Sequence, residues 1–333
     1  MGSGDGLRRV LVSGGCGFIG CNFLRQVVPE QPRTQWINLD ALTYAGRLEN
    51  TEDFADADNY SFVRGSISDI SLVEDLVSEG VDAVVNFAAE SHVDRSIAGP
   101  EVFVSTNVMG TQNLLEAARR HGVRSFLQIS TDEVYGSLEP DEAAFTERSP
   151  LEPNSPYSAS KASADLLCRA YYETYGMPVM ITRCSNNYGP YQYPEKLIPL
   201  FIRRALADEP VPLYGDGLNV RDWLHVEDHC RAVAAVLERG EPGAIYNVGG
   251  SNERTNREIT AIILDYLGKS GDLISYVTDR LGHDRRYAID SSRLQRTLGW
   301  KPEHTFEEGV RQTIDWYRHN LDWVSRVTAE VAE

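Results

Sequence analysis

Two acidic side chains stand next to each other near the middle of the chain. Asp132 and Glu133 lie in the segment STDEVYG, directly after the apolar stretch RSFLQIS, which is typical of a buried strand. Burying two adjacent carboxyl groups without partners would cost free energy. Neighbouring carboxyl groups tend to split their pKa values, so that one keeps a proton while the other is ionised. Such a pair could supply an acid and a base at one site.

A tyrosine and a lysine follow at helical spacing. Tyr157 and Lys161 are four residues apart, in a segment that reads as a helix starting near Pro156, so they share one helical face. A phenol is a poor base at neutral pH because its normal pKa is about 10, but a nearby ammonium lowers that value. The pair could remove a proton from an alcohol while hydride leaves the same carbon. The same spacing also occurs in amphipathic surface helices.

A glycine-rich loop lies near the start of the chain. SGGCGFIG carries Gly14, Gly17 and Gly20 between a predicted strand and a predicted helix, where backbone N–H groups can approach a diphosphate. Asp40 stands twenty residues beyond Gly20, at the end of the next predicted strand, where an acid can bind ribose hydroxyls and repel an additional phosphate. The alternative is a tight turn followed by a solvated acid. Loop and acid together favour NAD over NADP.

The elements that must position these residues alternate along the chain. Strands alternating with helices predict an α/β protein with a Rossmann-type doubly wound parallel sheet and a smaller C-terminal α/β substrate-binding domain. Strands are expected within 8–14, 34–40, 81–90 and 124–131, and helices within 17–30 and 104–122. The NAD-binding domain is expected at 7–185, rejoined by about 219–248, and the second domain at 186–218 and 249–325, where loops rich in Pro, Gly and Tyr begin.

The charge of the chain limits its partners. The net charge is −17 over 333 residues, which argues against nucleic acid and anionic membrane surfaces, although a local basic cluster could still bind an anionic substrate. There is neither a run long enough to span a membrane nor the apolar core of a signal peptide, so we expect a cytoplasmic protein without membrane contact. The five cysteines are odd in number and form no C-x-x-C pair, so we expect buried thiols and no metal.

Taken together, these segments resemble the extended short-chain dehydrogenase/reductases. Within them the chain is similar to the dTDP-glucose 4,6-dehydratases over nearly its whole length. The matching stretches are GGCGFIG, NLDALTYAG, NFAAESHVDRSI, STDEVYG, YSASK, RCSNNYGPYQYPEKLIPL, PLYGDGLNVRDWLHVEDH, GHDRRYAID and LGWKP. The resemblance implies a lyase that oxidises C4 of the glucose with bound NAD, eliminates water across C5 and C6, and returns the hydride to C6.

The resemblance also implies a role for each reactive side chain. Glu133 would be the base at C5 and Asp132 the acid at the C6 hydroxyl. Tyr157 would be the base at C4, with Lys161 tuning it and holding the nicotinamide ribose, and Thr131 would hydrogen-bond near O4. The 4-epimerases on a similar scaffold need the tyrosine and a hydroxyl partner but no elimination, so Thr131, Asp132 and Glu133 together favour a dehydratase.

Further residues are carried over as binding positions. The cofactor-binding positions are Gly14, Gly17, Phe18, Ile19, Gly20, Asp40, Thr43, Ser66, Ile67, Ala88, Tyr157 and Lys161. The substrate-binding positions are Ser91, Thr131, Asn186, Glu195, Lys196, Leu197, Pro212, Tyr214, Arg221, Asn256, His283, Arg286 and Tyr287. Lys196, Arg221 and Arg286 are the candidate cations for the nucleotide diphosphate. Trp223 and Trp300 are expected in the core.

The chain departs from the family pattern at a few positions. Ala41 stands where many relatives carry lysine, and Ser66 where an acid usually faces the adenine, which leaves Asp69 as the acid of that loop. Leu281 replaces a usual proline, and Cys16 and Cys21 flank the glycine loop. These changes affect the expected cofactor affinity more than the reaction type.

Two alternatives and one assembly follow from the same residues. The chain could act as a dehydratase or epimerase on a UDP- or GDP-linked sugar, or it could be a non-catalytic NAD-dependent regulator, which would not need all five reactive side chains. The segments 107–120 and 158–176 carry wide apolar stripes, and relatives pair these two helices across a two-fold axis. We therefore expect a homodimer formed through a four-helix bundle.

Overall fold

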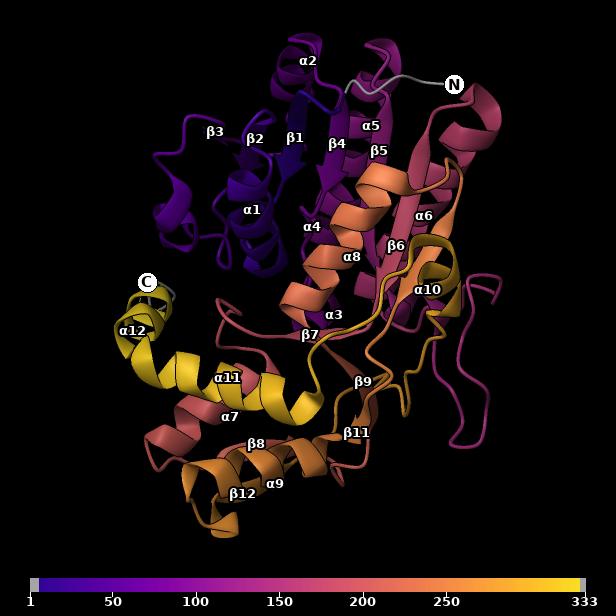
Figure 1. The fold of residues 1–333 in the computed structure, drawn as a ribbon. Coiled ribbons are helices and arrows are strands. Elements are labelled where there is room, and N and C mark those ends of the chain that lie inside the picture. The colour runs from indigo at the N-terminus through magenta and orange to yellow at the C-terminus, as the bar shows by residue number, and fades with distance from the viewer. Residues whose placement is uncertain (1–5, 330–333) are drawn as a thin grey trace.

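The computed structural model describes residues 6–329, and its centre is a seven-stranded parallel sheet (Figure 1). The strand order is β3-β2-β1-β4-β5-β6-β10, and every neighbouring pair is parallel. The strands are β1 (Arg9–Ser13), β2 (Gln35–Asp40), β3 (Tyr60–Arg64), β4 (Ala83–Asn86), β5 (Ser125–Thr131), β6 (Val179–Cys184) and β10 (Ile245–Val248). The predicted fold class is confirmed, including the return of the chain to the sheet at β10.

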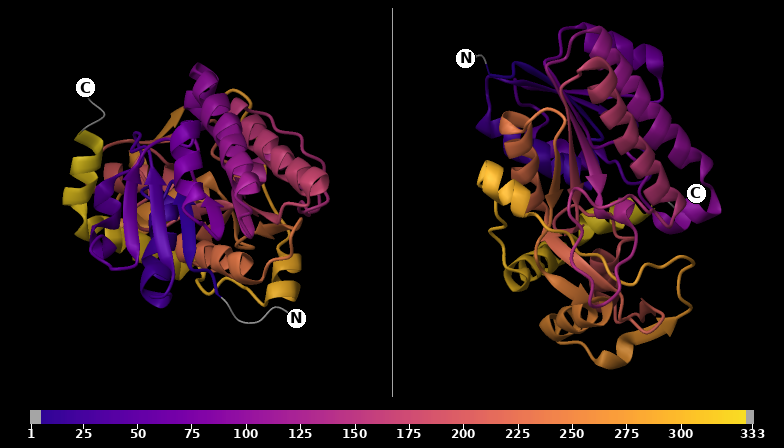
Figure 2. Two further views of the ribbon diagram at one scale, coloured as in Figure 1. Left: turned by 90° about the horizontal axis from the view of Figure 1, so that it is seen from above. Right: turned by 90° about the vertical axis from the view of Figure 1, so that its right-hand side faces the viewer.

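Helices cover both faces of this sheet (Figure 2), because side chains alternate along each strand. On β1, Val10 and Val12 belong to one buried cluster and Leu11 to another. The first cluster packs under α1 (Phe18–Glu30), α8 (Val226–Arg239) and α10 (Ser292–Leu298). The second packs under α2 (Ile70–Ser78), α5 (Thr111–Arg120) and α6 (Pro156–Tyr175).

The expected helix over 104–122 is not one continuous α-helix. Short helices α3 (Val93–Ala98) and α4 (Glu101–Phe103) precede a π-helical segment, Val104–Gly110, which leads into α5. In this segment Asn107 exchanges two hydrogen bonds with the backbone of Glu90, and a Cβ on Gly110 would lie 2.5 Å from the side chain of Ile67. The wider π-helical turn accommodates the side chain of Asn107, which is hydrogen-bonded to the loop after β4. The periodicity of the sequence does not reveal this turn.

The second unit is smaller and lies at the carboxyl ends of the strands (Figure 1). It contains a three-stranded sheet, a two-stranded sheet and four helices around one apolar cluster. The strands are β7 (Asn186–Tyr188), β9 (Val220–His225) and β11 (Glu253–Thr255), with β8 (Val211–Tyr214) beside β12 (Ile274–Val277). The helices are α7 (Leu197–Leu206), α9 (Asn256–Leu267), α11 (Phe306–His319) and α12 (Leu321–Ala329).

The structure refines the expected boundary between the two units. β9 pairs with β7 and β11, while α8 and β10 lie on the large sheet, so the range 219–248 is shared between the two units. Trp223 and Trp300 are buried in apolar clusters, as expected. The exact division into two domains remains a prediction.

All five cysteines are buried and free, which confirms the expected thiols. Across residues 6–329, no helix combines the length and the apolar character needed to cross a bilayer.

Candidate active site

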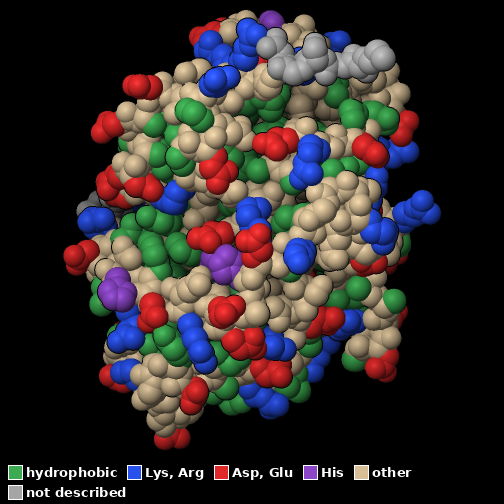
Figure 3. Space-filling view, viewed as in Figure 1, with side chains coloured by type: hydrophobic (Ala, Val, Ile, Leu, Met, Phe, Trp, Pro, Cys, Tyr) green, Lys and Arg blue, Asp and Glu red, His purple; other side chains and the backbone are tan. Residues whose placement is uncertain are grey.

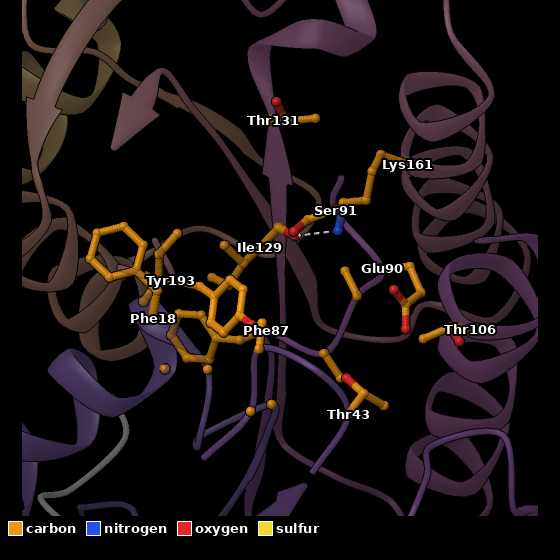
Figure 4. Close-up of a pocket in the computed structure, with 18 of the residues that line it drawn as sticks. Phe18, Thr43, Phe87, Glu90, Ser91, Thr106, Ile129, Thr131, Lys161 and Tyr193 are labelled. Carbon is orange, nitrogen blue, oxygen red and sulfur yellow. Dashed lines mark hydrogen bonds between the residues drawn. The ribbon is translucent and has the colours of Figure 1, made fainter. Parts of the chain in front are cut away.

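A cavity of about 330 Å³ opens at the carboxyl ends of the parallel strands (Figure 4). In open α/β sheets this edge is where ligands bind. The expected residues that line it are Gly14, Gly17, Phe18, Ile19, Gly20, Asp40, Thr43, Ser66, Ile67, Ala88, Ser91, Thr131, Asp132, Glu133, Tyr157 and Lys161. The structure therefore brings every predicted catalytic and cofactor-binding residue to one cavity.

The glycine loop is shaped by close backbone packing. Gly14 has φ +76°, and a Cβ there would lie 2.6 Å from the backbone nitrogen of Ala88. A Cβ on Gly20 would lie 2.3 Å from the carbonyl oxygen of Gly14. Gly17 precedes α1 without a side-chain cap, so the free N–H groups of the first turn face the cavity. The dipole of α1 and the backbone N–H groups at its N-terminus favour a diphosphate at this position, so the loop fits the phosphates of NAD.

Asp40 is the last residue of β2 and lines the same cavity. Its two carboxyl oxygens accept the backbone N–H groups of Cys16, at 2.9 Å, and of Leu42, at 2.8 Å. Burial raises the pKa of Asp40, and these two hydrogen bonds oppose the rise. The carboxyl group is held in place at the strand end, where it fits ribose hydroxyls and disfavours a further phosphate.

Asp132 and Glu133 begin a 3₁₀ turn directly after β5. Thr131 caps this turn, since its hydroxyl accepts the N–H of Glu133 at 3.2 Å. Asp132 is only 2% exposed, and within residues 6–329 no group hydrogen-bonds its Oδ2. Burial, followed by the negative charge of Glu133, raises the pKa of Asp132 well above its usual value. Burial and the neighbouring negative charge thus favour the protonated form of Asp132.

Glu133 lies in a different electrostatic environment. Burial raises its pKa too, but the positive charges of Arg221, Lys196 and Arg280 oppose the rise. For Asp132 the negative charges of Glu133 and Asp222 raise the pKa more than Arg221 lowers it. The two carboxyl groups therefore differ in the expected direction, with Glu133 the easier of the two to ionise.

Tyr157 and Lys161 share the buried face of α6, as expected from their spacing. Ser155 caps this helix in a capping box and Pro156 starts it, which confirms the predicted beginning. Burial, then the charge of Glu133, raises the pKa of Tyr157 well above its usual value. The Nζ of Lys161 donates to the carbonyl oxygen of Ile129 at 2.7 Å (dashed line in Figure 4).

This arrangement corrects one expectation. The ammonium of Lys161 was expected to lower the pKa of Tyr157, whereas the pKa is raised because burial outweighs the other influences. The neighbouring hydroxyl of Thr131 opposes the rise in the pKa of Tyr157. Thr131 and Tyr157 line the same cavity, and the expected hydrogen bond of Thr131 near O4 of the sugar stays a prediction.

A second cavity, also of about 330 Å³, adjoins the first on the side of the smaller unit. Glu133 lines both cavities, so it stands at their junction. Asn186, Glu195 and Lys196 do the same. The other expected substrate-binding residues that line the second cavity are Leu197, Pro212, Tyr214, Arg221, Asn256, His283 and Tyr287.

Two of the three expected cations face this second cavity. Arg221 donates to the backbone carbonyl of Asp284 at 3.0 Å and lies 4.2 Å over the ring of Tyr287. Lys196 donates from Nζ to the carbonyl of Ser91 at 3.0 Å. Both are fixed by backbone acceptors and keep further N–H groups for an anion.

Arg286 does not line either cavity, contrary to expectation. Its guanidinium binds both carboxyl oxygens of Glu253, at 2.6 and 2.9 Å, and the carbonyl of Glu142 at 2.7 Å. Asp69, expected as the remaining acid near the adenine, instead caps α2 by accepting two backbone N–H groups and is absent from the cavity walls. Ala41 and Ser66, in contrast, do face the first cavity.

The sequence did not identify several residues that line these cavities. Arg280 lines the second one and holds Asp94 at 2.8 Å, and it sits one residue before Leu281 in a stretch next to a matched motif. Tyr44, in the matched stretch NLDALTYAG, donates to Glu195 at 3.0 Å. Thr106 enters the first cavity from the π-helical segment, for which the sequence carries no clear signal.

Comparison with known proteins places the chain in a family. A family model described as GDP-mannose 4,6 dehydratase matches residues 11–313. A dTDP-glucose 4,6-dehydratase from Xanthomonas campestris is 54% identical over 336 residues, which cover 95% of each chain. The chain belongs to the dTDP-glucose 4,6-dehydratase family.

Solved structures agree with this membership. DesIV, a dTDP-glucose 4,6-dehydratase from Streptomyces venezuelae crystallised with NAD and a second ligand, is 52% identical, has a TM-score of 0.93, and is matched over 96% of this chain and 99% of its own. A UDP-glucose 4-epimerase from Thermotoga maritima, solved with UDP-glucose, has a TM-score of 0.88 but only 29% identity, over 94% of this chain and 99% of its own. The fold is thus shared with epimerases, whereas the closer sequence similarity is to the dTDP-glucose 4,6-dehydratase family.

Proposed function

We propose that the chain converts dTDP-glucose to dTDP-4-keto-6-deoxyglucose with tightly bound NAD. Its relatives in Xanthomonas campestris and Streptomyces venezuelae are named dTDP-glucose 4,6-dehydratase, and the latter is crystallised with NAD. One observation carries the proposal: Asp132 and Glu133 are adjacent carboxyl groups in different electrostatic environments, both line the first cavity, and Glu133 also lines the second. An elimination needs both an acid and a base, and this pair supplies them.

In this proposal the chain's own groups move the protons. Tyr157 takes the proton of the C4 hydroxyl, and Thr131, which lines the same cavity, hydrogen-bonds near O4. Glu133, which three cations help to ionise, removes the proton from C5. Asp132, kept protonated by burial, donates to the C6 hydroxyl so that it departs as water. NAD, when bound, accepts the hydride from C4 and returns it to C6, so no cofactor is consumed.

The cofactor and the sugar nucleotide occupy different cavities in this account. NAD binds along the glycine loop and Asp40, and Lys161 holds its nicotinamide ribose. Arg221 and Lys196 bind the diphosphate of the sugar nucleotide in the second cavity. Arg286, paired with Glu253, is left out of this set.

The alternatives predict different site chemistry. A 4-epimerase oxidises and reduces C4 and has no use for a protonated carboxyl group beside an ionisable one. A regulator that binds NAD without catalysis has no use for either. The nucleotide attached to the sugar depends on contacts at the far end of the second cavity, so UDP- and GDP-linked sugars are the substrates to compare.

The test is incubation with dTDP-glucose and no added cofactor. The expected result is a 4-keto-6-deoxy sugar, detected by the absorbance that such products develop in alkali. UDP-glucose and GDP-glucose, tested in parallel, should react at least tenfold more slowly. Formation of a C4 epimer without loss of water would overturn the proposal, and so would a faster reaction with either of the other two nucleotides.

We further propose that the chain is a homodimer. The helices α4 to α6 lie side by side on one face (Figure 2), and several of their large apolar side chains are exposed. These side chains are Val102, Val104, Met109, Leu166, Tyr172 and Tyr175. A second copy that packs the same helices against these would bury them in a four-helix bundle. A cytoplasmic location remains the expectation for its site of action, to be tested by cell fractionation.

A further inference from the structure

Two histidines from distant parts of the sequence meet away from both cavities. His225 ends β9, and His304 lies in the connection between α10 and α11. Their ring centroids are 4.1 Å apart, with the rings tilted by 30°. Glu227, in the first turn of α8, completes a cluster in which one ligand atom of each residue lies within 4.8 Å of the others. Figure 3 shows histidine and acidic side chains gathered on the surface near this end of α8.

His225 forms the buried side of this cluster. It is 3% exposed, and no group among the described residues hydrogen-bonds to Nδ1 or Nε2. Buried polar groups without a partner cost free energy and are rare in folded proteins. The two ring nitrogens of His225 therefore lack a partner among the described residues, and one of them is available to bind a metal ion.

His304 is held in the manner of a metal ligand. Its Nδ1 lies 3.1 Å from Oδ1 of Asp228, and its backbone N–H donates to Oδ2 of the same residue at 3.0 Å. Its Nε2 lies 3.5 Å from Oε2 of Glu227. Ligating histidines commonly donate their second ring N–H to a carboxylate, which fixes the tautomer and directs the other nitrogen toward the ion. Asp228 is placed to do this for His304.

We propose that His225, Glu227 and His304 bind one divalent transition-metal ion of the zinc class. Two imidazoles and one carboxylate, with water in the fourth position, suit Zn²⁺ and its analogue Co²⁺, whereas Mg²⁺ and Ca²⁺ prefer oxygen ligands alone. The His304 side chain is 18% exposed and that of Glu227 58% exposed, so both can turn toward an ion that His225 holds from the buried side. The ion enters from solvent on the exposed side, where His304 and Glu227 lie.

The surrounding charges favour a cation. Asp228 and Glu303 lie beside the cluster, and Arg231 is paired with both. Glu227 adds a third carboxylate beside His304, and it is not paired with Arg231. None of the three proposed ligands lines either of the two cavities, so a bound ion would join the connection after α10 to the start of α8 without touching the reacting atoms. We expect a bound ion to stabilise the fold rather than to change the reaction.

The cysteine spacing of the sequence gave no sign of this site, because two of its ligands are histidines that lie far apart in the chain.

The test uses tag-free, full-length protein treated with a chelator and then dialysed. Titration with Co²⁺ should give one equivalent bound with the intense visible absorption of a four-coordinate site, and Zn²⁺ should displace it. At about 100-fold excess over the dissociation constant, Zn²⁺ should raise the midpoint of thermal unfolding by about 3–5 °C. Glu227→Gln, a change at an exposed position, should weaken binding at least tenfold, and His304→Gln should abolish it.

A matched control separates this site from other histidines. His319 is an exposed histidine on α11 outside the cluster, and His319→Gln should bind Co²⁺ as the unmodified protein does. Stoichiometric binding that depends on Glu227 and His304 but not on His319 supports the proposal. Absence of binding would overturn it. So would binding that Glu227→Gln and His304→Gln leave unchanged, because the ion would then sit elsewhere.

Discussion

A buried ion pair beneath α6 offers a sharp test of how the fold supports the reactive lysine. Arg183 of β6 donates from Nε to Oδ2 of Asp165 at 2.8 Å, and the two side chains are only 4% and 1% exposed. Asp165 lies one helical turn after Lys161. Arg183 also donates to the hydroxyl of Tyr135 at 3.0 Å, and its guanidinium lies 4.8 Å over the tyrosine ring. The pair thus connects the helix that carries Tyr157 and Lys161 to the strand behind it.

Asp165→Asn should cost a large part of the stability. Removing one partner of a buried ion pair leaves an uncompensated charge and typically costs about 3–5 kcal/mol. Because Arg183 keeps Tyr135 as a partner, we expect the lower end of that range, about 3 kcal/mol. The double variant Asp165→Leu/Arg183→Met should cost less than Asp165→Asn alone, since it leaves no unpaired guanidinium at this position. Urea unfolding measures both, and a loss below about 1 kcal/mol for Asp165→Asn would refute the reasoning.

The same substitution should change the pH dependence of catalysis. Burial lowers the pKa of Lys161, and the charge of Asp165 opposes that shift. Without that charge the pKa falls further, so the ammonium is lost at a lower pH as the pH rises. The alkaline limb of the kcat profile should therefore move toward neutral pH in Asp165→Asn, while the acid limb stays in place. An unchanged alkaline limb in a folded variant would mean that Asp165 does not act on Lys161.

The remaining predictions concern the cofactor and the assembly. Enzyme stripped of its cofactor should regain activity with NAD, whereas NADP should be at least 100-fold less effective because Asp40 repels the additional phosphate; equal recovery with NADP would contradict this role. Gly20→Ala should lose NAD binding in a fluorescence titration because its Cβ would lie 2.3 Å from the carbonyl oxygen of Gly14; unchanged binding would mean that the loop is less constrained than it appears in the fold. Light scattering should give the mass of a dimer at micromolar concentration and that of a monomer for Leu166→Glu, and a monomer for the unmodified chain would exclude the four-helix bundle.

Features fixed by local chemistry were predictable from the sequence. The glycine loop, the acid at the end of β2 and the start of α6 follow from backbone geometry and capping, which depend on neighbouring residues. The parallel sheet follows from the alternation of strands and helices. For the same reason, the predicted catalytic residues meet in one cavity, because the ends of parallel strands share one edge of a sheet.

Features that depend on contacts distant in sequence were not predictable. Arg286 was expected at the substrate, but Glu253 of β11 pairs with it, whereas the neighbouring Arg280 faces the second cavity. The pKa of Tyr157 rises because of burial, which spacing along a helix does not measure. The π-helical segment depends on the hydrogen bonds between Asn107 and the loop after β4. In each case the deciding partner lies far along the chain.

The central claim is that the two adjacent carboxyl groups have different catalytic roles. Asp132 acts as the general acid and Glu133 as the general base. In both Asp132→Asn and Glu133→Gln we expect a slow reaction with dTDP-glucose, because loss of such a group typically costs on the order of 10²–10⁴ in rate. Glu133→Gln should still oxidise C4, so it should accumulate bound NADH and incorporate no solvent deuterium at C5.

The most direct measurement compares the two variants on dTDP-6-fluoro-6-deoxyglucose, in which the group leaving C6 needs no proton. The loss of rate in Asp132→Asn should shrink markedly with this substrate, because the acid is no longer required. The loss in Glu133→Gln should remain, because the C5 proton must still be removed. Equal recovery in both variants, or recovery in neither, would contradict the assignment of separate acid and base roles to Asp132 and Glu133.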